Sequence, residues 1–180
     1  GIDFADKTNG KFDPTIGPLV DLWSIHGPKQ EQYIAPSKEE IEKTLTLVDY
    51  KLIEFNDENK TIRLPKTGMI IDLGAIAKGY AADKVVEYLQ SQNIQHAIVN
   101  LGGNIYAYGT RYAKRNNGTN DWVIGIMDPR IEVELQRKEI GILRVKHKTL
   151  VTSGIYQRYV IESNTNKFYH HIINPDTGYP

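Results

Sequence analysis

Residues 68–92 have the sequence GMIIDLGAIAKGYAADKVVEYLQSQ, in which a short apolar run precedes a long segment with helical spacing. The run Met69–Ile71 predicts a short buried strand, and the segment from about Ala75 to Gln90 predicts an α-helix. The carboxylate of Asp72 is therefore expected between the end of a strand and the start of a helix. A strand that leads directly into a helix is the first architectural feature that the sequence indicates.

Strand patterns dominate the rest of the chain. Ser37 and Glu40 form a capping-box pattern, and the spacing of Ile41, Leu45 and Val48 predicts a helix after it. The segments with strand patterns are LIEF (52–55), TIRL (61–64), AIVN (97–100), NIYAYG (104–109), WVIGIMD (122–128), EIGILRV (139–145), KTLVTSG (148–154), YQRYVIES (156–163) and KFYHHII (167–173). The first two are separated by NDENK and predict a hairpin. We therefore predict an α+β fold of mostly antiparallel strands with two helices packed on them, in a single domain over residues 1–180.

Both ends of the sequence resemble interrupted elements. Residues 1–10 predict the last turns of a helix, closed by Gly10 in the C′ position. Residues 11–23 are expected to follow an irregular path because they contain Pro14, Gly17 and Pro18. The sequence stops at NPDTGYP (174–180), a turn pattern with no element after it. We therefore expect the fold to be truncated at both ends.

The composition excludes several classes of function. The 22 basic residues balance the 22 acidic ones, which gives no indication of a nucleic-acid surface. The absence of cysteine excludes disulfides, thiolate metal sites and a cysteine nucleophile. These residues contain no apolar run long enough to span a membrane and no secretory signal pattern.

The segment from Asp72 to Asp83 is the densest candidate for chemistry. A helix N-terminus offers free N–H groups and the positive end of the helix dipole, and Lys78 lies one turn into the helix. This arrangement suits a phosphate, a ribose or the edge of a ring. The alternative is structural: Asp72 caps the helix, while Gly74 and Ala75 allow close packing. Both interpretations are open on the residues alone.

The C-terminal cluster HHIINPDTG (170–178) is the second candidate. Neighbouring side chains on a strand point to opposite faces, so His170 and His171 are not expected to clamp one metal ion. A single histidine that faces a cleft could act as a general base, and the alternative is an exposed histidine at a strand end. Near the N-terminus, Phe12 and Asp13 form either the wall of a ligand slot or a structural loop.

Two other motifs carry weaker signals. LGGN (101–104) departs from the GxGxxG pattern and precedes a strand, so we expect Gly102 and Gly103 to permit a sharp turn beside a ligand. Ser153 lacks the GxSxG context of a nucleophile elbow, and a turn that hydrogen-bonds its own backbone is the expected role of this segment.

Taken together, five stretches resemble the ApbE family, the FAD:protein FMN transferases. They occur in the family's order and are GKFDPTIGPLVDLW (10–23), DLGAIAKGYAADKV (72–85), NLGGNIYAYG (100–109), VTSGIYQRY (151–159) and HHIINPDTGYP (170–180). The resemblance implies Mg²⁺-dependent transfer of the FMN part of FAD to a Thr or Ser of a target protein, with release of AMP. It also implies an extracytoplasmic bacterial protein, commonly a membrane-anchored lipoprotein.

The resemblance also implies roles for individual residues. The positions that match the family's FAD contacts are Lys11, Phe12, Asp13, Asp72, Lys78 and Ile173. Ala75 matches the residue whose backbone carbonyl helps to hold the metal. His171 matches the histidine proposed to assist catalysis, and it could take the proton from the acceptor hydroxyl.

The sequence departs from the family pattern in three respects. Asn174 stands where the family usually has Asp. The family's main metal-binding segment would lie beyond Pro180, and a further FAD contact would lie before Gly1. For these 180 residues alone we therefore expect weak metal binding and little transfer. Two alternatives remain: a module that binds FAD without chemistry, and a FAD pyrophosphatase that yields FMN and AMP.

Overall fold

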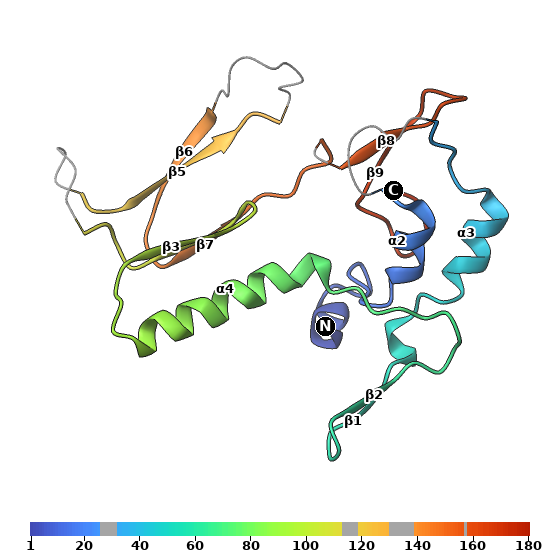
Figure 1. Ribbon diagram of the computed structural model, residues 1–180, viewed down its shortest axis with the longest axis horizontal. Helices are drawn as coiled ribbons and strands as arrows, with labels where there is room; N and C mark the ends of the chain where they lie inside the picture. The colour runs from blue at the N-terminus through green and yellow to red at the C-terminus, as the bar shows by residue number, and fades with distance from the viewer. Residues whose placement is uncertain (26–31, 113–118, 130–138, 157) are drawn as a thin grey trace. The chain divides into compact units, whose positions relative to one another are not determined.

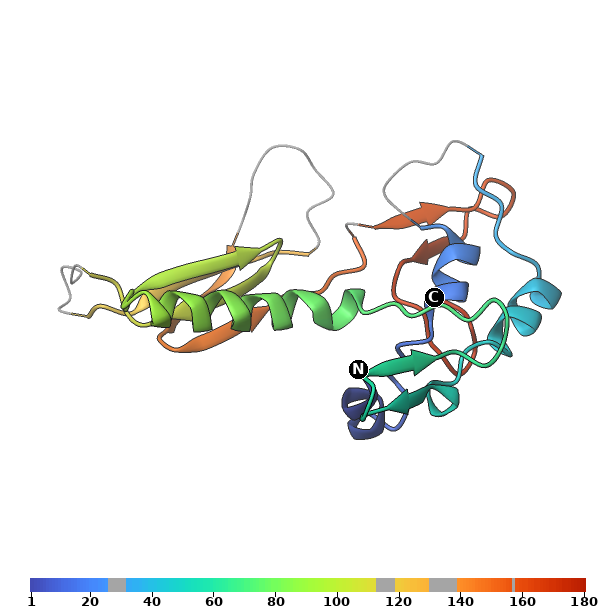
Figure 2. The same ribbon diagram turned by 60° about the horizontal axis from the view of Figure 1, so that its bottom comes forward.

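The computed structural model describes residues 1–25, 32–112, 119–129, 139–156 and 158–180 (Figure 1, Figure 2). The chain divides into two compact units. Unit 1 consists of Gly1–Ala75 and Ile155–Pro180, and unit 2 consists of Ile76–Gly154. Each unit has a hydrophobic core of its own. The prediction of a single domain over residues 1–180 stays a prediction.

Unit 1 combines short helices with two hairpins. Its helices are α1 (Ile2–Lys7), α2 (Gly17–Trp23), α3 (Lys38–Leu45) and the 3-10 turn η1 (Tyr50–Leu52). Its strands are β1 (Glu54–Asn56), β2 (Thr61–Arg63), β8 (Tyr159–Ile161) and β9 (Phe168–His170). β1 pairs with β2 and β8 pairs with β9, both antiparallel, so the predicted hairpin at 52–64 is confirmed.

The core of unit 1 is built around Trp23, whose side chain is only 1% exposed. Its indole Nε1 donates a hydrogen bond of 2.7 Å to the carbonyl of Gly178. The rings of Tyr169 and Tyr179 lie 4.8 and 5.8 Å from the Trp23 ring, centroid to centroid. Tyr33 donates its hydroxyl to the Trp23 carbonyl at 2.8 Å, and burial raises the pKa of Tyr33 to about 12. The core therefore joins α2 to the last residues of the chain.

Local sequence signals explain the start of α3. Ser37 Oγ accepts from Glu40 N, and the Glu40 carboxylate accepts from Ser37 N at 2.8 Å, which confirms the capping box. The Ser37 hydroxyl, and then its amide, lower the pKa of Glu40 because both donate to the carboxylate. Ile41 is buried, while Val48 lies after the end of the helix and packs against the core.

The end of α1 differs from the prediction by one position. Asn9 N donates to Asp6 O at 3.1 Å and Gly10 N donates to Ala5 O at 2.8 Å, the two bonds of a Schellman motif. These bonds put Asn9, with φ of 50°, in the C′ position, and Gly10 follows it. The prediction of Gly10 at C′ is wrong because asparagine also tolerates the left-handed region.

Residues 17–23 are helical, so the prediction of an irregular path is wrong for this part. Pro18 lies in the first turn of α2, where no intrahelical partner is needed for its missing N–H. The predicted strand Met69–Ile71 is reduced to one parallel bridge between Ile16 and Ile70, and Ile70 is 42% exposed. The pairing ends after one residue because the chain enters α2 directly after Ile16.

Unit 2 packs one long helix on a sheet. Helix α4 (Gly74–Ser91) confirms the predicted helix, and Figure 2 shows it lying along the sheet of order β3-β4-β7. That sheet contains β3 (Ala97–Leu101), β4 (Asn104–Tyr108) and β7 (Lys148–Val151), and a separate two-stranded sheet joins β5 (Trp122–Met127) to β6 (Glu139–Val145). Ala82 and Val86 of α4 pack against Val99 of β3.

The predicted fold class is confirmed. The five strand pairings in the described part of the chain, which form four sheets, are all antiparallel, and helices pack on them in both units. Among the described helices, α1 agrees with the helix end expected within residues 1–10, α3 and α4 agree with the two helices predicted from their spacing, and α2 was not predicted. Within the described ranges, no helix combines the length and the hydropathy needed to cross a bilayer.

Gly178 provides a test of this core. Its φ is +75°, and a Cβ there would lie 2.6 Å from Ile41 Cγ2. We expect Gly178→Ala to lower the free energy of unfolding by about 2–4 kcal/mol, from backbone strain and crowding together. Gly10→Ala is the control, because φ is +79° there and the nearest atom would lie at 3.7 Å. Urea unfolding of the two variants should separate crowding from strain, and equal losses would contradict the packing argument.

Candidate functional site

The loop after α1 is held by hydrogen bonds to Thr8. Thr8 Oγ1 accepts a hydrogen bond from Phe12 N at 3.0 Å, and Thr8 O accepts from Lys11 N at 3.1 Å. The Lys11 side chain is exposed, and Phe12 is half-buried. Two of the residues predicted to contact FAD thus lie on a fixed loop at the surface of unit 1.

Asp13 on the same loop turns inward and is only 8% exposed. Its Oδ1 accepts from Thr15 N at 2.7 Å and from Thr15 Oγ1 at 2.6 Å, and its Oδ2 accepts from Tyr50 N at 3.0 Å. The hydroxyl of Thr15 also accepts from Asp49 N at 2.9 Å. This carboxylate therefore ties the loop to η1, which corresponds to the structural interpretation of Asp13. Its FAD contact stays a prediction.

His171 follows the last residue of β9. Its backbone N donates to Arg158 O at 3.1 Å, and its Nδ1 lies 3.2 Å from the same oxygen. A carbonyl oxygen can only accept, so Nδ1 carries the hydrogen of this bond. In the neutral ring, the basic lone pair is then on Nε2. The geometry is compatible with a general base, and the catalytic role stays a prediction.

His170 has a different partner. Its Nδ1 lies 3.3 Å from Ile172 N, which donates to it, and its ring contacts Phe168 edge-on. The two histidines therefore make separate contacts, as the alternation of side chains on a strand predicts. Within the ranges that the structure describes, no three side chains of His, Asp or Glu form a group that could hold a metal ion.

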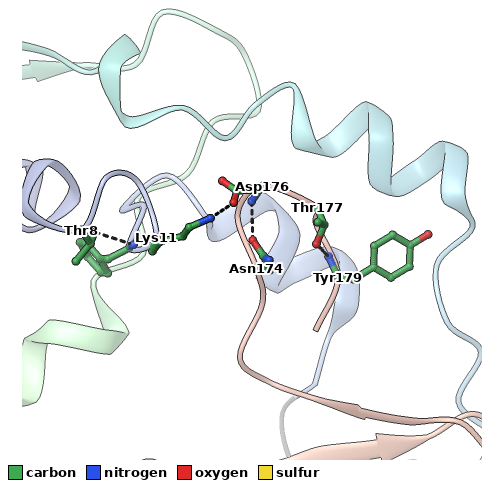
Figure 3. A network of polar contacts seen from close by, with 7 residues as sticks. Thr8, Lys11, Asn174, Asp176, Thr177 and Tyr179 are labelled. Atoms are coloured by element: carbon green, nitrogen blue, oxygen red, sulfur yellow. Dashed lines mark hydrogen bonds and ion pairs between the residues drawn. The ribbon is translucent and has the colours of Figure 1, made fainter.

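The turn after His171 is strongly organised (Figure 3). Asn174 Oδ1 accepts from Asp176 N at 2.9 Å, and Asn174 N donates to Tyr179 O at 2.8 Å. Thr177 Oγ1 accepts from Tyr179 N at 3.4 Å. Asn174 thus stabilises the turn with an oxygen that an aspartate would also supply, so the departure from the family pattern leaves the turn intact.

An ion pair joins this turn to the N-terminal loop. Lys11 Nζ contacts Asp176 Oδ2, although the two residues lie 165 positions apart (Figure 3). Ile173, in the same C-terminal segment, is half-buried and packs against the core around Trp23. The structure therefore brings Lys11 to the segment that contains His171 and Ile173, within unit 1.

Asp72 is tied to the same region. Its backbone N donates to Pro14 O at 2.8 Å, next to Asp13, and its Oδ1 accepts from Gly74 N at 2.6 Å. The second bond is the capping role that the sequence offered as the structural alternative. Ala75, one residue into the helix from Gly74, is exposed. The FAD contact of Asp72 and the metal contact of Ala75 stay predictions.

Lys78 belongs to unit 2, where it is exposed on α4.

The predicted sharp turn at LGGN is confirmed, because φ is +61° at Gly102 and +90° at Gly103. Asn104 after this turn is 5% exposed, and its Oδ1 has no hydrogen-bond partner among the described residues. The sequence did not single out Asn104 or Asp176, since each depends on contacts that no local pattern encodes.

The residues described do not make a complete Mg²⁺ site. Mg²⁺ prefers an octahedral set of oxygen ligands. Of the predicted metal contacts, only the Ala75 carbonyl is present, and the described residues add no acidic cluster beside it. The expected Mg²⁺ therefore receives no support from this geometry.

Comparison with known proteins identifies the family. The model of the ApbE family matches residues 1–180, and the chain therefore belongs to this family. The FAD:protein FMN transferase of Treponema pallidum is 35% identical over 98% of this chain, and that of Klebsiella pneumoniae is 36% identical over 94%. FAD is thus the substrate of the family, and the resemblance found in the five motifs is confirmed.

Solved structures agree with this assignment. The crystal structure of the ApbE protein of Thermotoga maritima is 38% identical, with a TM-score of 0.83 over 99% of this chain and 53% of that one. The flavin transferase ApbE of Vibrio cholerae is 30% identical, with a TM-score of 0.75 over 99% of this chain and 52% of that one. The chain spans about half the length of the curated relatives, 49% and 48% for the two transferases above.

Asp13 offers a test of how the loop is held. We expect Asp13→Ala to lower the free energy of unfolding by about 2–4 kcal/mol, because buried amides lose a charged acceptor. Asp21→Ala is the matched control, since Asp21 is exposed on α2, and it should change stability by less than about 0.5 kcal/mol. Thermal and urea unfolding measure both. A stable Asp13→Ala variant would show that the carboxylate does not organise the loop.

Proposed function

We propose that this protein binds FAD and transfers its FMN part to a Thr or Ser hydroxyl of a target protein, releasing AMP. The observation that carries the proposal is the Lys11–Asp176 contact, which joins two separate family motifs in one unit. Family membership over residues 1–180 supports it independently. The whole activity is a proposal because the chain spans half of its relatives.

The proposed FAD contacts have complementary chemistry. The ammonium groups of Lys11 and Lys78 attract phosphate oxygens, and Phe12 and Ile173 offer apolar surface to a ring. The carboxylate of Asp72 accepts hydrogen bonds from hydroxyl or ring N–H groups. Each group lies among the residues that the structure describes. These roles rest on the family motifs at matching positions.

The proposed reaction is a phosphoryl transfer. The oxygen of the acceptor hydroxyl forms a bond to the FMN phosphorus, and the bond from that phosphorus to the oxygen bridging to AMP breaks. AMP leaves with that oxygen, and the hydroxyl proton goes to His171. His171 is suited to this step because its Nδ1 donates to Arg158 O, which leaves the basic lone pair on Nε2. Positioning of the acceptor hydroxyl at the phosphorus supplies the remaining rate acceleration.

The proposed requirement for Mg²⁺ rests only on the family resemblance. When bound, a divalent cation would neutralise charge on the pyrophosphate. Ala75 would contribute its backbone carbonyl, and the described residues supply no further set of ligands. No step above depends on the metal. Transfer measured with Mg²⁺ and with a chelator decides whether these residues need it, and we expect the chain to bind it weakly.

Two other functions are tested by the same measurements. FAD binding without chemistry is favoured by the half-length coverage of the relatives. In that case flavin fluorescence changes on binding but no AMP appears. A FAD pyrophosphatase would give FMN and AMP in the absence of an acceptor. Chromatography of the nucleotides, with and without an acceptor peptide, separates the three functions.

His171→Ala tests the catalytic proposal. In the full-length natural protein, supplied with FAD, Mg²⁺ and a peptide that carries an acceptor Thr, we expect the rate of peptide flavinylation to fall about 100-fold or more, because the base is lost. FAD affinity should stay within about threefold, a change below 1 kcal/mol. Mass spectrometry of the peptide and titration of flavin fluorescence provide the two readouts.

The matched control is His170→Ala, which removes the neighbouring imidazole. This variant should retain most of the wild-type transfer rate. Equal loss of transfer in both variants, or equal loss of transfer and FAD binding in His171→Ala, would contradict the base role. No flavinylation by the full-length natural protein would remove the transferase proposal itself.

We also propose, on the family resemblance, an extracytoplasmic bacterial setting with a membrane-anchored lipoprotein, and one flavin transferase domain that contains both units. Fractionation of cells that express the natural gene tests the setting, and recovery in the cytoplasm would contradict it. A single cooperative unfolding transition supports the single domain, whereas two separate transitions would contradict it.

A further inference from the structure

We propose that Asp176 is the resident counter-ion of Lys11 and that it weakens the binding of pyrophosphate-bearing ligands at this place. The inference rests on the proposed function only in taking FAD as the natural ligand. Its chemical content is narrower: an anion that binds Lys11 must compete with a carboxylate of the protein. Asp176 would then set the affinity of the candidate site without itself contacting the reacting atoms.

The ion pair differs from the others that the structure describes. The other four lie in unit 1 or on α4 and join side chains no more than nine positions apart, as Arg63 and Glu54 do across a hairpin. Lys11 and Asp176 are separated by 165 positions. The pair therefore links two segments that only the tertiary fold brings together, and both segments contain predicted site residues.

The backbone holds both charges in place. Asp176 N donates to Asn174 Oδ1 at 2.9 Å, and Gly178 N donates to Asn174 O at 2.8 Å. Gly178 O in turn accepts from the buried indole of Trp23. On the other side, Lys11 N is bonded to Thr8 O at 3.1 Å. The Lys11 and Asp176 side chains therefore lie close together because hydrogen bonds hold the turns that carry them.

Simple electrostatics gives the direction of the effect. A pyrophosphate group is attracted by the ammonium of Lys11 and repelled by the carboxylate of Asp176, so the two contributions largely cancel. Both side chains are exposed, at 65% and 53%, so water and salt screen each contribution. Removing the carboxylate charge should therefore strengthen anion binding modestly, by about two- to fivefold, and removing the ammonium should weaken it by a similar factor.

The proposal also explains what Lys11 does without a ligand. A lysine has three N–H donors, and one of them is used by Asp176. The remaining donors can reach a phosphate oxygen while the carboxylate stays nearby. Asp176 thus keeps Lys11 at the place where the ligand is expected, at the cost of affinity.

The experiment compares four variants of the full chain by isothermal titration calorimetry. The variants are Asp176→Asn, Lys11→Met, the double variant, and Asp57→Asn. The last is the matched control, because Asp57 forms an exposed ion pair with Lys60 in the β1–β2 turn, a segment that carries none of the predicted site residues. Inorganic pyrophosphate is the probe, and FAD is titrated in parallel. Asp176→Asn retains the backbone amide that bonds Asn174, and thermal unfolding verifies its fold.

We expect Asp176→Asn to bind pyrophosphate about two- to fivefold more tightly than wild type, with a steeper salt dependence. Asp57→Asn should match wild type, and in the Lys11→Met background the gain from Asp176→Asn should be smaller, because only the repulsion by the carboxylate is then removed. Unchanged or weaker binding by Asp176→Asn, or a gain that is undiminished after loss of Lys11, overturns the proposal.

The two ligands separate this inference from the proposed function. A gain with pyrophosphate in a protein that does not bind FAD supports the counter-ion role and contradicts the flavin transferase function. FAD binding that is the same in Asp176→Asn, Asp57→Asn and wild type supports the function and overturns the counter-ion role.

Discussion

The hydrogen bond from the Trp23 indole to the Gly178 carbonyl is the constraint on which the rest of unit 1 depends. It lies in a core where a buried N–H without an acceptor would cost free energy. Through it, the turn at 174–178 is fixed against α2. That turn places Asp176 at Lys11 and sets the direction from which the chain leaves His171. The geometry of the candidate site therefore depends on the hydrogen bond that the Trp23 indole donates to Gly178.

Local chemistry made part of the fold predictable. The capping box at Ser37, the hairpin at 52–64 and the helix that became α4 follow from side chains within a few positions of each other. The two exceptions have different causes, one local and one dependent on a distant partner. Residues 17–23 form a helix although proline and glycine occur there, because Pro18 is acceptable in a first turn. In the predicted strand Met69–Ile71, only Ile70 pairs with another residue, Ile16.

The candidate site shows the same division. The family motifs identified the segments correctly, and family membership is confirmed, but they did not indicate how each side chain is used. Asp13 turns inward to bind Thr15 and Tyr50, and Asp72 bonds the first amide of α4. The partners of Asp13 could not be predicted because a motif records which residue is present and not which way it points, whereas the cap at Asp72 was one of two interpretations that the residues left open. The Lys11–Asp176 ion pair could not be predicted either, because its two residues lie 165 positions apart in the sequence.

The division of the chain has a consequence for its biosynthesis. Unit 2 is one continuous segment, whereas unit 1 is assembled from residues 1–75 and 155–180. The core contacts of Trp23 with Tyr169 and Gly178 close long loops, of 155 positions in the case of Gly178, so they cannot form until these C-terminal residues have left the ribosome. Unit 2 can fold during synthesis, whereas the Trp23 indole of α2 has no Gly178 carbonyl to bond until later. In a nascent chain, the apolar surface of α2 thus stays exposed until the segment that covers it has been made.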